Sequence, residues 1–274
     1  MPELPEVETI VNELRHKISG LQIKQCEVYR DNIIAGDQQQ FVSTVTGKRI
    51  ETISRRGKYL IFQLSSPWRM IVHLRMTGKF ICDNQLLPQR HNRLCFLLSD
   101  DSYLIYSDMR CFGTFELCSE EEHPKLNSLG PEPLSKEFTP RLLRQTLQKR
   151  KTNIKDFLLD QRNLAGLGNI YASEILFDAR IHPETPTQLL QKEDVSRLYT
   201  SIGRILKKAI RHNGTTISDY RQVDDKTGAF QHFLKVYGKE NQPCRSCGQN
   251  IQKIKQNQRS SFFCPACQIK PEAA

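Results

Sequence analysis

The stretch Cys244-Arg-Ser-Cys247 … Cys264-Pro-Ala-Cys267 decides the fold of the C-terminal part of the chain. Two CxxC pairs separated by residues 248–263 have the spacing of a four-cysteine zinc site, in which two tight turns place four thiolates tetrahedrally. Two disulfides or a redox motif are the alternatives, and both fit a reducing compartment less well. Because such closed sites are structural, we expect one Zn²⁺ ion per chain that takes no part in chemistry.

The segment between the two cysteine pairs is basic. It contains Lys253, Lys255 and Arg259, several Asn and Gln amides, and no Asp or Glu. We expect a two-stranded ribbon whose tip presents cations and amides, which are groups that bind phosphates and groove edges. A solvated hairpin without a partner is the alternative, and the absence of acidic residues disfavours it.

The whole chain has the same bias. Its 274 residues contain 40 Lys and Arg against 30 Asp and Glu, a net charge of +10. A basic chain without a secretory signal most often binds a polyanion, and a membrane-surface role is the weaker alternative. No apolar run approaches the roughly 20 residues that span a bilayer. We therefore expect a soluble cytoplasmic protein with no membrane partner.

Hydrophobic periodicity predicts a strand-rich first half. Residues 5–17 carry one apolar stripe at helical spacing. Short alternating runs separated by turn signals follow, and they favour a pair of packed sheets. The predicted strands are 22–29, 48–56, 59–64, 70–75, 78–83, 93–98, 102–107 and 113–118.

The second half is predicted to be helical. A Pro- and Gly-containing stretch at 124–140 indicates a linker, and it ends in Thr139-Pro140, a typical helix start. Asn213-Gly214 is a stop signal, and residues 230–237 return to an extended pattern. The predicted helices are 140–150, 153–161, 169–179 and 193–212.

Gly166-Leu-Gly168-Asn169 lies between two predicted helices. Glycines allow a backbone to approach a phosphate closely, and the N-terminus of the following helix offers unpaired N–H groups. This motif is weak alone, since glycines often only make turns. Lys151 and Lys155 nearby strengthen the interpretation as a clamp on a nucleic-acid backbone.

Two strand ends carry an unusual mixture of side chains. His73-Leu-Arg75-Met76-Thr-Gly78 and Asp108-Met-Arg110-Cys-Phe112-Gly113 each combine an arginine and a large apolar residue with a glycine. Exposed apolar side chains of this kind can act as wedges between DNA bases. Periodicity alone favours the other interpretation, in which Met76 and Phe112 are core residues. Arg55-Arg56-Gly57-Lys58 is similarly either a solvated strand edge or a phosphate contact.

The chain begins Met1-Pro2-Glu3. Removal of Met1 would leave Pro2 as a secondary α-amine, a group that titrates near 8 and is partly unprotonated at neutral pH. Such an amine condenses with an aldehyde carbon to give a cationic iminium, and the Glu3 carboxylate can move protons beside it. A proline that merely starts a helix is the alternative, and these three residues alone favour it.

Together these stretches resemble the formamidopyrimidine-DNA glycosylases, bacterial base-excision repair enzymes of the helix–two-turn–helix class. The resemblance spans nearly the whole chain in order. Its motifs are MPELPEVET at the start, RRGKYL at 55–60, HLRMTG at 73–78, MRCFG at 109–113, LGPEP at 129–133, GLGNIYASE at 166–174, VYG at 236–238 and the four-cysteine ribbon.

The resemblance implies an α+β protein with a two-sheet β-sandwich flanked by helices, a helical helix–two-turn–helix domain and a β-ribbon zinc finger. We expect these at residues 1–130, 131–229 and 230–274. The implied activity is a bifunctional glycosylase and abasic-site lyase that removes 8-oxoguanine and formamidopyrimidines from duplex DNA by β,δ-elimination. We expect a monomer associated with the bacterial nucleoid. A non-catalytic zinc-ribbon DNA-binding protein is the alternative.

The resemblance also implies roles for single residues. Pro2 would attack C1′ of the damaged nucleotide, with Glu3 and Lys58 as further catalytic residues and Glu6 supporting the N-terminus. The loop near 215–228, with Thr215, Thr216 and Tyr220, would close over the extruded base, and Arg110 would face the orphan cytosine. The residues expected at the DNA are Glu6, His73, Met76, Arg110, Phe112, Lys155, Asn169, Tyr237 and Arg259; those expected at the metal are Cys244, Cys247, Cys264 and Cys267.

The chain departs from the family pattern at two places. The ribbon tip reads Gln258-Arg259-Ser260-Ser261-Phe262, so Arg259 is kept while the glycines usual on either side of it are absent. Cys111 replaces a frequent lysine between Arg110 and Phe112.

Overall fold

The computed structural model describes residues 1–86, 90–119, 123–215 and 228–271. They fall into two units, one formed by residues 1–127 with 212–231 and the other by residues 128–211 with 232–274. The boundaries expected after residues 130 and 229 stay predictions. Within the described residues, no helix is long and apolar enough to cross a membrane.

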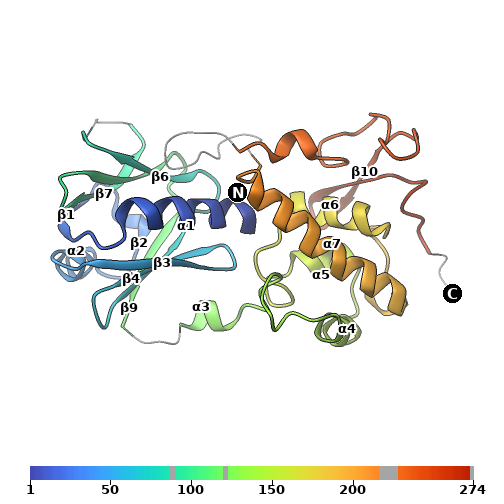
Figure 1. Ribbon diagram of the computed structural model, residues 1–274, viewed down its shortest axis with the longest axis horizontal. Helices are drawn as coiled ribbons and strands as arrows, with labels where there is room; N and C mark the ends of the chain where they lie inside the picture. The colour runs from blue at the N-terminus through green and yellow to red at the C-terminus, as the bar shows by residue number, and fades with distance from the viewer. Residues whose placement is uncertain (87–89, 120–122, 216–227, 272–274) are drawn as a thin grey trace. The chain divides into compact units, whose positions relative to one another are not determined.

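Among the described residues of the first unit, nine strands form two sheets (Figure 1). In chain order they are β1 (Ile23–Val28), β2 (Ile34–Ala35), β3 (Ile50–Arg56), β4 (Tyr59–Leu64), β5 (Arg69–His73), β6 (Gly78–Asp83), β7 (Asn92–Leu98), β8 (Tyr103–Asp108) and β9 (Thr114–Cys118). The order is β1-β7-β8-β6 in one sheet and β2-β9-β5-β4-β3 in the other. All eight predicted strands are present.

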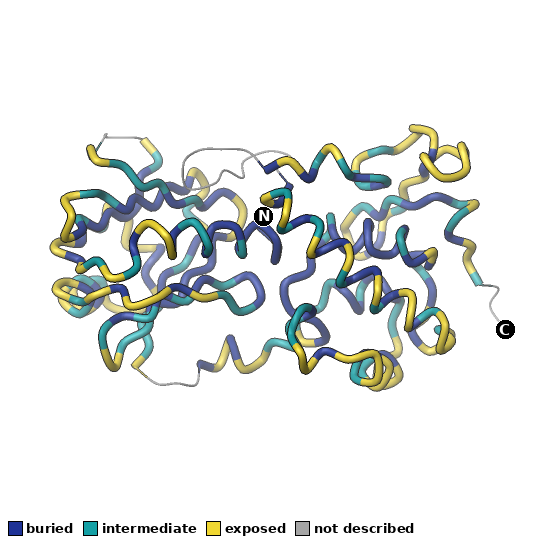
Figure 2. Tube along the Cα trace, in the orientation of Figure 1, coloured by how far each residue is buried: buried dark blue, intermediate teal, exposed yellow. Residues whose placement is uncertain are grey.

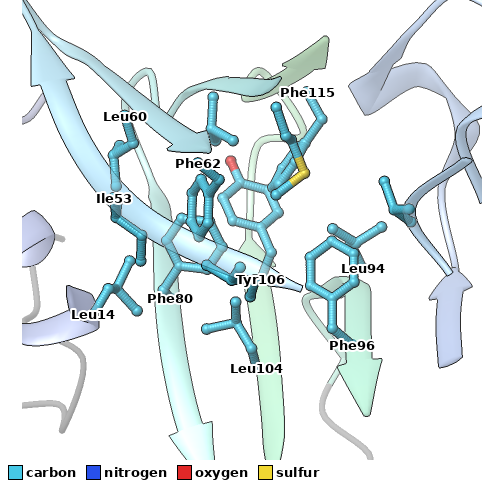
Figure 3. Close-up of a cluster of buried hydrophobic side chains, with 14 of the residues drawn as sticks. Leu14, Ile53, Leu60, Phe62, Phe80, Leu94, Phe96, Leu104, Tyr106 and Phe115 are labelled. Carbon is cyan, nitrogen blue, oxygen red and sulfur yellow. The ribbon is translucent and has the colours of Figure 1, made fainter. Parts of the chain in front are cut away.

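Aromatic side chains from both sheets meet in the core of this unit (Figure 3). The ring of Tyr106 on β8 lies 5.5 Å from Phe80 on β6 and 4.8 Å from Phe115 on β9, between ring centroids. Phe80 in turn lies 5.6 Å from Phe62 on β4. Because these contacts join strands of different sheets, the predicted sandwich is confirmed. Almost every position of β7 and β8 is buried (Figure 2).

The predicted first helix is α1 (Leu4–Ile18). Its apolar stripe is fully buried and packs on β3. The Arg15 guanidinium also donates to β3, to the carbonyl oxygen of Ile53, at 2.7 and 3.0 Å. Glu8 pairs with Arg55 at 2.8 Å. The helix therefore carries the N-terminal residues to a fixed place against the five-stranded sheet.

Two short helices of this unit were not predicted. Helix α2 (Gln38–Val45) begins at Asp37, whose carboxylate accepts the N–H of Gln40 at 2.7 Å. Its first residues are three glutamines, so only Phe41 and Val45 are buried and the apolar stripe is too short to recognise. Helix α3 (Pro124–Asn127) lies in the stretch predicted to be a linker.

The second unit contains the predicted helices α4 (Pro140–Gln148), α5 (Ile154–Leu159), α6 (Asn169–Ala179) and α7 (Lys192–Arg211). The Thr139 hydroxyl accepts the N–H of Leu142 at 3.2 Å, which confirms the predicted N-cap of α4. Asn213 and Gly214, which follow the end of α7 after His212, both have positive φ, as the stop signal requires.

The extended structure predicted for residues 230–237 is wrong. Phe230–Phe233 form a 3₁₀ turn, labelled η3, in which Phe230 is buried. The alternation of apolar and polar residues was mistaken for a strand because a three-residue repeat and a two-residue repeat cannot be distinguished over so few positions.

The predicted ribbon consists of β10 (Gln252–Gln256) and β11 (Arg259–Phe263), paired from Gln252↔Phe263 to Gln256↔Arg259. Asn257 and Gln258 form the turn, both with positive φ (42° and 63°). This is the geometry of a tight hairpin turn that prefers Asn-Gly, so Gln258 occupies a position where glycine is favoured.

Replacing Gln258 with glycine should therefore stabilise the ribbon. A side chain in the left-handed region costs about 1 kcal/mol, and Gln258→Gly removes that cost. We expect a higher midpoint for thermal unfolding of the zinc-loaded protein. Gln252→Gly, at an exposed strand position, is the matched control and should lower the midpoint. If both variants lowered the unfolding midpoint equally, Gln258 would not be strained.

Candidate functional site

The N-terminal residues are tied down by a buried carboxylate. Met1 is exposed, whereas Pro2 and Glu3 are buried. Glu6 is 2% exposed; its Oε2 accepts the N–H of Glu3 at 2.8 Å, and its Oε1 accepts the N–H of Thr215 at 2.7 Å. The expected support of the N-terminus by Glu6 is thus visible as hydrogen bonds. A direct DNA contact by Glu6 stays a prediction, since its buried carboxylate is bonded here to protein backbone.

Position 214, which lies beside Glu6, requires a glycine. A Cβ there would lie 2.7 Å from Glu6 Oε1 and 2.9 Å from Glu6 Cγ, and its φ of +73° also suits glycine. The Asn213-Gly214 stop therefore ends α7 and also brings the Thr215 N–H to the carboxylate. Thr216 and Tyr220, expected in the same loop, lie outside the described residues.

Lys58 and His73 lie at one end of the five-stranded sheet. Lys58 is in the turn between β3 and β4, and His73 ends β5 opposite Tyr59, with their rings 4.7 Å apart. His73 Nδ1 accepts the N–H of Arg75 at 3.0 Å. Burial, followed by the positive charges of Arg75 and Lys58, lowers the pKa of His73 to about 3. The ring is therefore neutral at pH 7, with its proton on Nε2, where it can donate to an anion.

The candidate wedge residues are exposed, not core. Met76 is 43% and Phe112 51% exposed, so the interpretation that periodicity favoured is wrong for both. The Arg110 guanidinium lies 4.6 Å from the centroid of the Phe112 ring, a cation–π contact. Arg110 and Phe112 thus form one exposed pair.

In the second unit, the start of α6 and the ribbon tip are joined through one carbonyl. The Ser260 carbonyl oxygen accepts from Asn169 Nδ2 at 3.0 Å and from Lys155 Nζ at 2.8 Å. Asn169 is only partly buried, and Arg259, next to Ser260 in the chain, is exposed at the tip. The structure therefore brings together the two motifs from which a phosphate clamp was predicted.

Lys155, which was expected at the DNA, is buried in this structure: its side chain is only 1% exposed, and its ammonium also donates to Ser261 Oγ at 2.6 Å. A direct contact of Lys155 with DNA stays a prediction. A buried ammonium must be satisfied by nearby acceptors, and here these are ribbon atoms. Lys155 holds the ribbon tip in place and does not itself reach solvent.

Tyr237 is positioned by a residue that the sequence analysis missed. Glu174 on α6 is 1% exposed, and its carboxylate accepts the backbone N–H groups of Lys235, Val236 and Tyr237, each at 2.9 Å. The Tyr237 ring then contacts Phe262 of β11, with centroids 5.2 Å apart. The available signal was an acid directly before the apolar run Ile175-Leu176-Phe177 in a predicted helix.

The four predicted zinc ligands converge. The sulfur atoms of Cys244, Cys247, Cys264 and Cys267 all lie within 4.8 Å of one another. Tetrahedral Zn–S bonds of about 2.3 Å place sulfurs a little under 4 Å apart, and the Cys244–Cys267 separation is 3.9 Å. No other group of three or more possible ligands occurs among the described residues. The site fits one structural Zn²⁺ ion.

Comparison with known proteins identifies the family. Residues 1–115 match the formamidopyrimidine-DNA glycosylase N-terminal domain, residues 129–221 its H2TH domain, and residues 241–269 the zinc finger found in FPG and IleRS. The chain belongs to the formamidopyrimidine-DNA glycosylase family. It is a DNA glycosylase for oxidised purines with the abasic-site lyase activity of that family.

Individual relatives agree over the full length. The formamidopyrimidine-DNA glycosylases of Desulforamulus reducens and Lactococcus lactis subsp. lactis are 41% and 43% identical, with 98% of this chain and 99% and 100% of the relatives covered. Two solved structures of the Lactococcus lactis enzyme, a point mutant with Fapy-dG-containing DNA and a complex with abasic-site DNA, superpose with TM-scores of 0.93 and 0.92 at 42% identity. They cover 98% of this chain and 100% of theirs.

The depressed pKa of His73 predicts a pH-dependent stability of the first unit. A histidine whose folded pKa is about 3 stabilises the fold fully above its unfolded pKa of about 6.5, and this is lost as the pH falls toward 3. In the wild type, the free energy of unfolding should fall by up to about 1.4 kcal/mol per pH unit between pH 6.5 and 4, and His73→Gln should remove this dependence. Urea unfolding followed by fluorescence of Trp68, the one tryptophan of the chain, measures it. His16→Gln, exposed on α1, is the control and should keep the slope.

Removal of zinc should weaken DNA binding without unfolding the first unit. Chelation frees the ribbon from its thiolate anchor, so DNA affinity should fall, while Trp68 fluorescence in the first unit should stay unchanged. Anisotropy of labelled duplex DNA measures the affinity, and restored zinc should recover it. Unchanged affinity after complete zinc release would show that the ribbon does not bind DNA.

Proposed function

We propose that Pro2, freed by removal of Met1, is the nucleophile of this glycosylase and lyase. The observation that supports it is the Glu6 carboxylate, which fixes Glu3 and Thr215 and so holds the residue next to Pro2 in one place. An N-terminus is usually mobile, and an amine held in position reacts far more readily than a mobile one.

The proposed reaction uses the chain's own groups. The Pro2 nitrogen forms a bond to C1′ as the bond from C1′ to the damaged base breaks, and the base leaves with a proton. Opening of the sugar ring transfers a proton to O4′ and leaves an iminium at C1′. We assign these proton transfers to Glu3, which is buried beside Pro2. The iminium then makes the C2′ proton acidic. Loss of that proton expels the 3′ phosphate by β-elimination, and loss of a second sugar proton expels the 5′ phosphate by δ-elimination.

The remaining assigned residues act on the DNA in this proposal. Lys58 and neutral His73 bind phosphate from the first unit, with Lys58 also serving the reaction. Asn169, Tyr237 and Arg259 bind phosphate from the second. Met76, Arg110 and Phe112 occupy the space left by the extruded nucleotide, because chemistry at C1′ requires the base to leave the stack. The partner is damaged duplex DNA, and the relatives' complexes with Fapy-dG and abasic-site DNA support this. Action as a monomer and association with the nucleoid belong to the same proposal.

Borohydride trapping tests the nucleophile. We expect reduction in the presence of 8-oxoguanine duplex to give a covalent complex whose adduct maps to the peptide that begins at Pro2, in protein whose intact mass lacks Met1. In protein that retains Met1, the Pro2 nitrogen is part of a peptide bond and cannot attack C1′, so no adduct should form at Pro2. Pro5→Ala, in the first turn of α1, is the matched control and should trap normally.

Two outcomes would overturn the assignment. One is an adduct on a lysine peptide, such as that containing Lys58. The other is undiminished trapping by protein that retains Met1. Binding of damaged DNA without any trapping would instead favour the non-catalytic DNA-binding alternative.

A further inference from the structure

Two exposed loops carry the candidate wedge residues, and the topology places them side by side. Residues 74–77 connect β5 to β6, and residues 109–113 connect β8 to β9. His73 pairs with Thr114 in the five-stranded sheet, and Gly78 pairs with Asp108 in the four-stranded sheet. Both loops therefore cross from one sheet to the other at the same end of the sandwich.

Each loop contains a backbone conformation that its residue disfavours. Arg75 has φ +54° directly before Met76, and Cys111 has φ +53° directly before Phe112. A non-glycine residue in the left-handed region persists only where surrounding contacts hold it. The two exposed apolar side chains thus both follow a strained residue, and something must stabilise the two turns.

Asp108 provides that stabilisation. It is fully buried, and its carboxylate accepts four hydrogen bonds. Oδ1 accepts from the Thr77 hydroxyl of the first loop and from the Arg110 N–H of the second, the latter at 3.1 Å. Oδ2 accepts from the Gly113 N–H at 2.9 Å and from the Tyr106 hydroxyl at 3.2 Å. The bonds to Arg110 and Gly113 lie on either side of the strained turn that leads into Phe112.

Thr77 makes the connection between the loops direct. Its hydroxyl donates to Asp108 and accepts the Arg110 N–H at 3.2 Å, and the side chain is 8% exposed. One buried carboxylate and one hydroxyl therefore set the position of the Arg110 backbone relative to the loop that carries Met76.

Tyr106 connects the two loops to the core of the sandwich. Its hydroxyl lies under both loops, since a Cβ on Gly78 would be 2.2 Å and a Cβ on Gly113 1.7 Å from the Tyr106 oxygen. Neither glycine can be replaced without displacing the tyrosine. The aromatic core, the carboxylate and the two loops thus form one rigid assembly below the exposed residues.

We propose that Asp108 and Thr77 are positioning residues for opposite-base recognition: they hold the Arg110 and Phe112 loop at a fixed register beside Met76. This rests on the proposed function, in which Arg110 enters the space left by the extruded nucleotide, and on the role that the family resemblance implies for Arg110, which is to face the unpaired cytosine of the opposite strand. The effect is on selectivity, because a displaced Arg110 loses the cytosine contact while the Pro2 amine and the phosphate contacts stay in place.

The test compares 8-oxoguanine opposite cytosine with 8-oxoguanine opposite adenine. Arg110→Ala sets the reference loss in the ratio of kcat/KM values. We expect Asp108→Asn, which keeps shape but turns one acceptor into a donor, to lower the ratio by about tenfold, the scale of a lost buried hydrogen bond to a charged group. The double variant Asp108→Asn with Arg110→Ala should lose no more than Arg110→Ala alone.

Thr77 gives an independent arm if Asp108→Asn fails to fold. Thr77→Val keeps the shape and removes the hydroxyl, so the ratio should fall, whereas Thr77→Ser keeps the hydroxyl and should restore it. Thr52→Val, at an exposed position of β3, is the matched control and should leave the ratio unchanged. A merely structural role for Thr77 would lower both kcat/KM values equally and leave their ratio intact.

These variants distinguish a failure of the positioning inference from a failure of the role assigned to Arg110. If Arg110→Ala loses selectivity while Asp108→Asn and Thr77→Val keep it, the positioning inference is wrong and the proposed function stands. If Arg110→Ala itself keeps selectivity, the assignment of Arg110 fails, and the inference fails with it.

Discussion

A buried carboxylate must find several hydrogen-bond donors, and this constraint organises the functional parts of the chain. Glu6, Asp108 and Glu174 are each 2% exposed or less, and each accepts at least two backbone N–H groups. An unpaired carboxylate in such a place costs several kcal/mol, so the carboxylate and the loop that supplies its donors become ordered together. The loops held in this way are the N-terminus, the Arg110 turn and the segment of Tyr237.

The same physics divides the cations into two groups. Lys155 is buried and is satisfied by ribbon acceptors, whereas Arg110 and Arg259 remain exposed. A net charge of +10 predicts a polyanionic partner but does not say which cations meet it. Burial decides that question: an ammonium whose donors are used within the protein orders a loop, and an exposed guanidinium on that ordered loop remains available to phosphate or base. Some cations of the chain thus stabilise its loops from inside, and others remain at the surface to bind DNA.

The sequence predicted what local patterns determine and missed what only tertiary contacts determine. The strands, the four cysteines and the caps at Thr139 and Asn213 were predictable because alternation, spacing and capping are local signals. Helix α2 was missed because its buried face is two residues long. Periodicity alone favoured the core for Met76 and Phe112, because a crossover between sheets takes a residue out of the alternating pattern; only the family resemblance placed them at the DNA, and both are exposed. Glu174 was missed because its donors lie on a distant segment.

The altered ribbon tip shows how a departure from a family pattern is accommodated. The two positions that lack the usual glycine differ in what they require: Gln258 has φ +63°, whereas Ser260 is not among the described residues with positive φ and pairs in the ribbon like any strand residue. Only the first substitution therefore carries a backbone cost. The contacts that hold the tip to Lys155 come from the Ser260 carbonyl and the Ser261 hydroxyl. Because neither contact uses the side chain at 258 or 260, the loss of both glycines leaves the tip anchored and Arg259 exposed at its end.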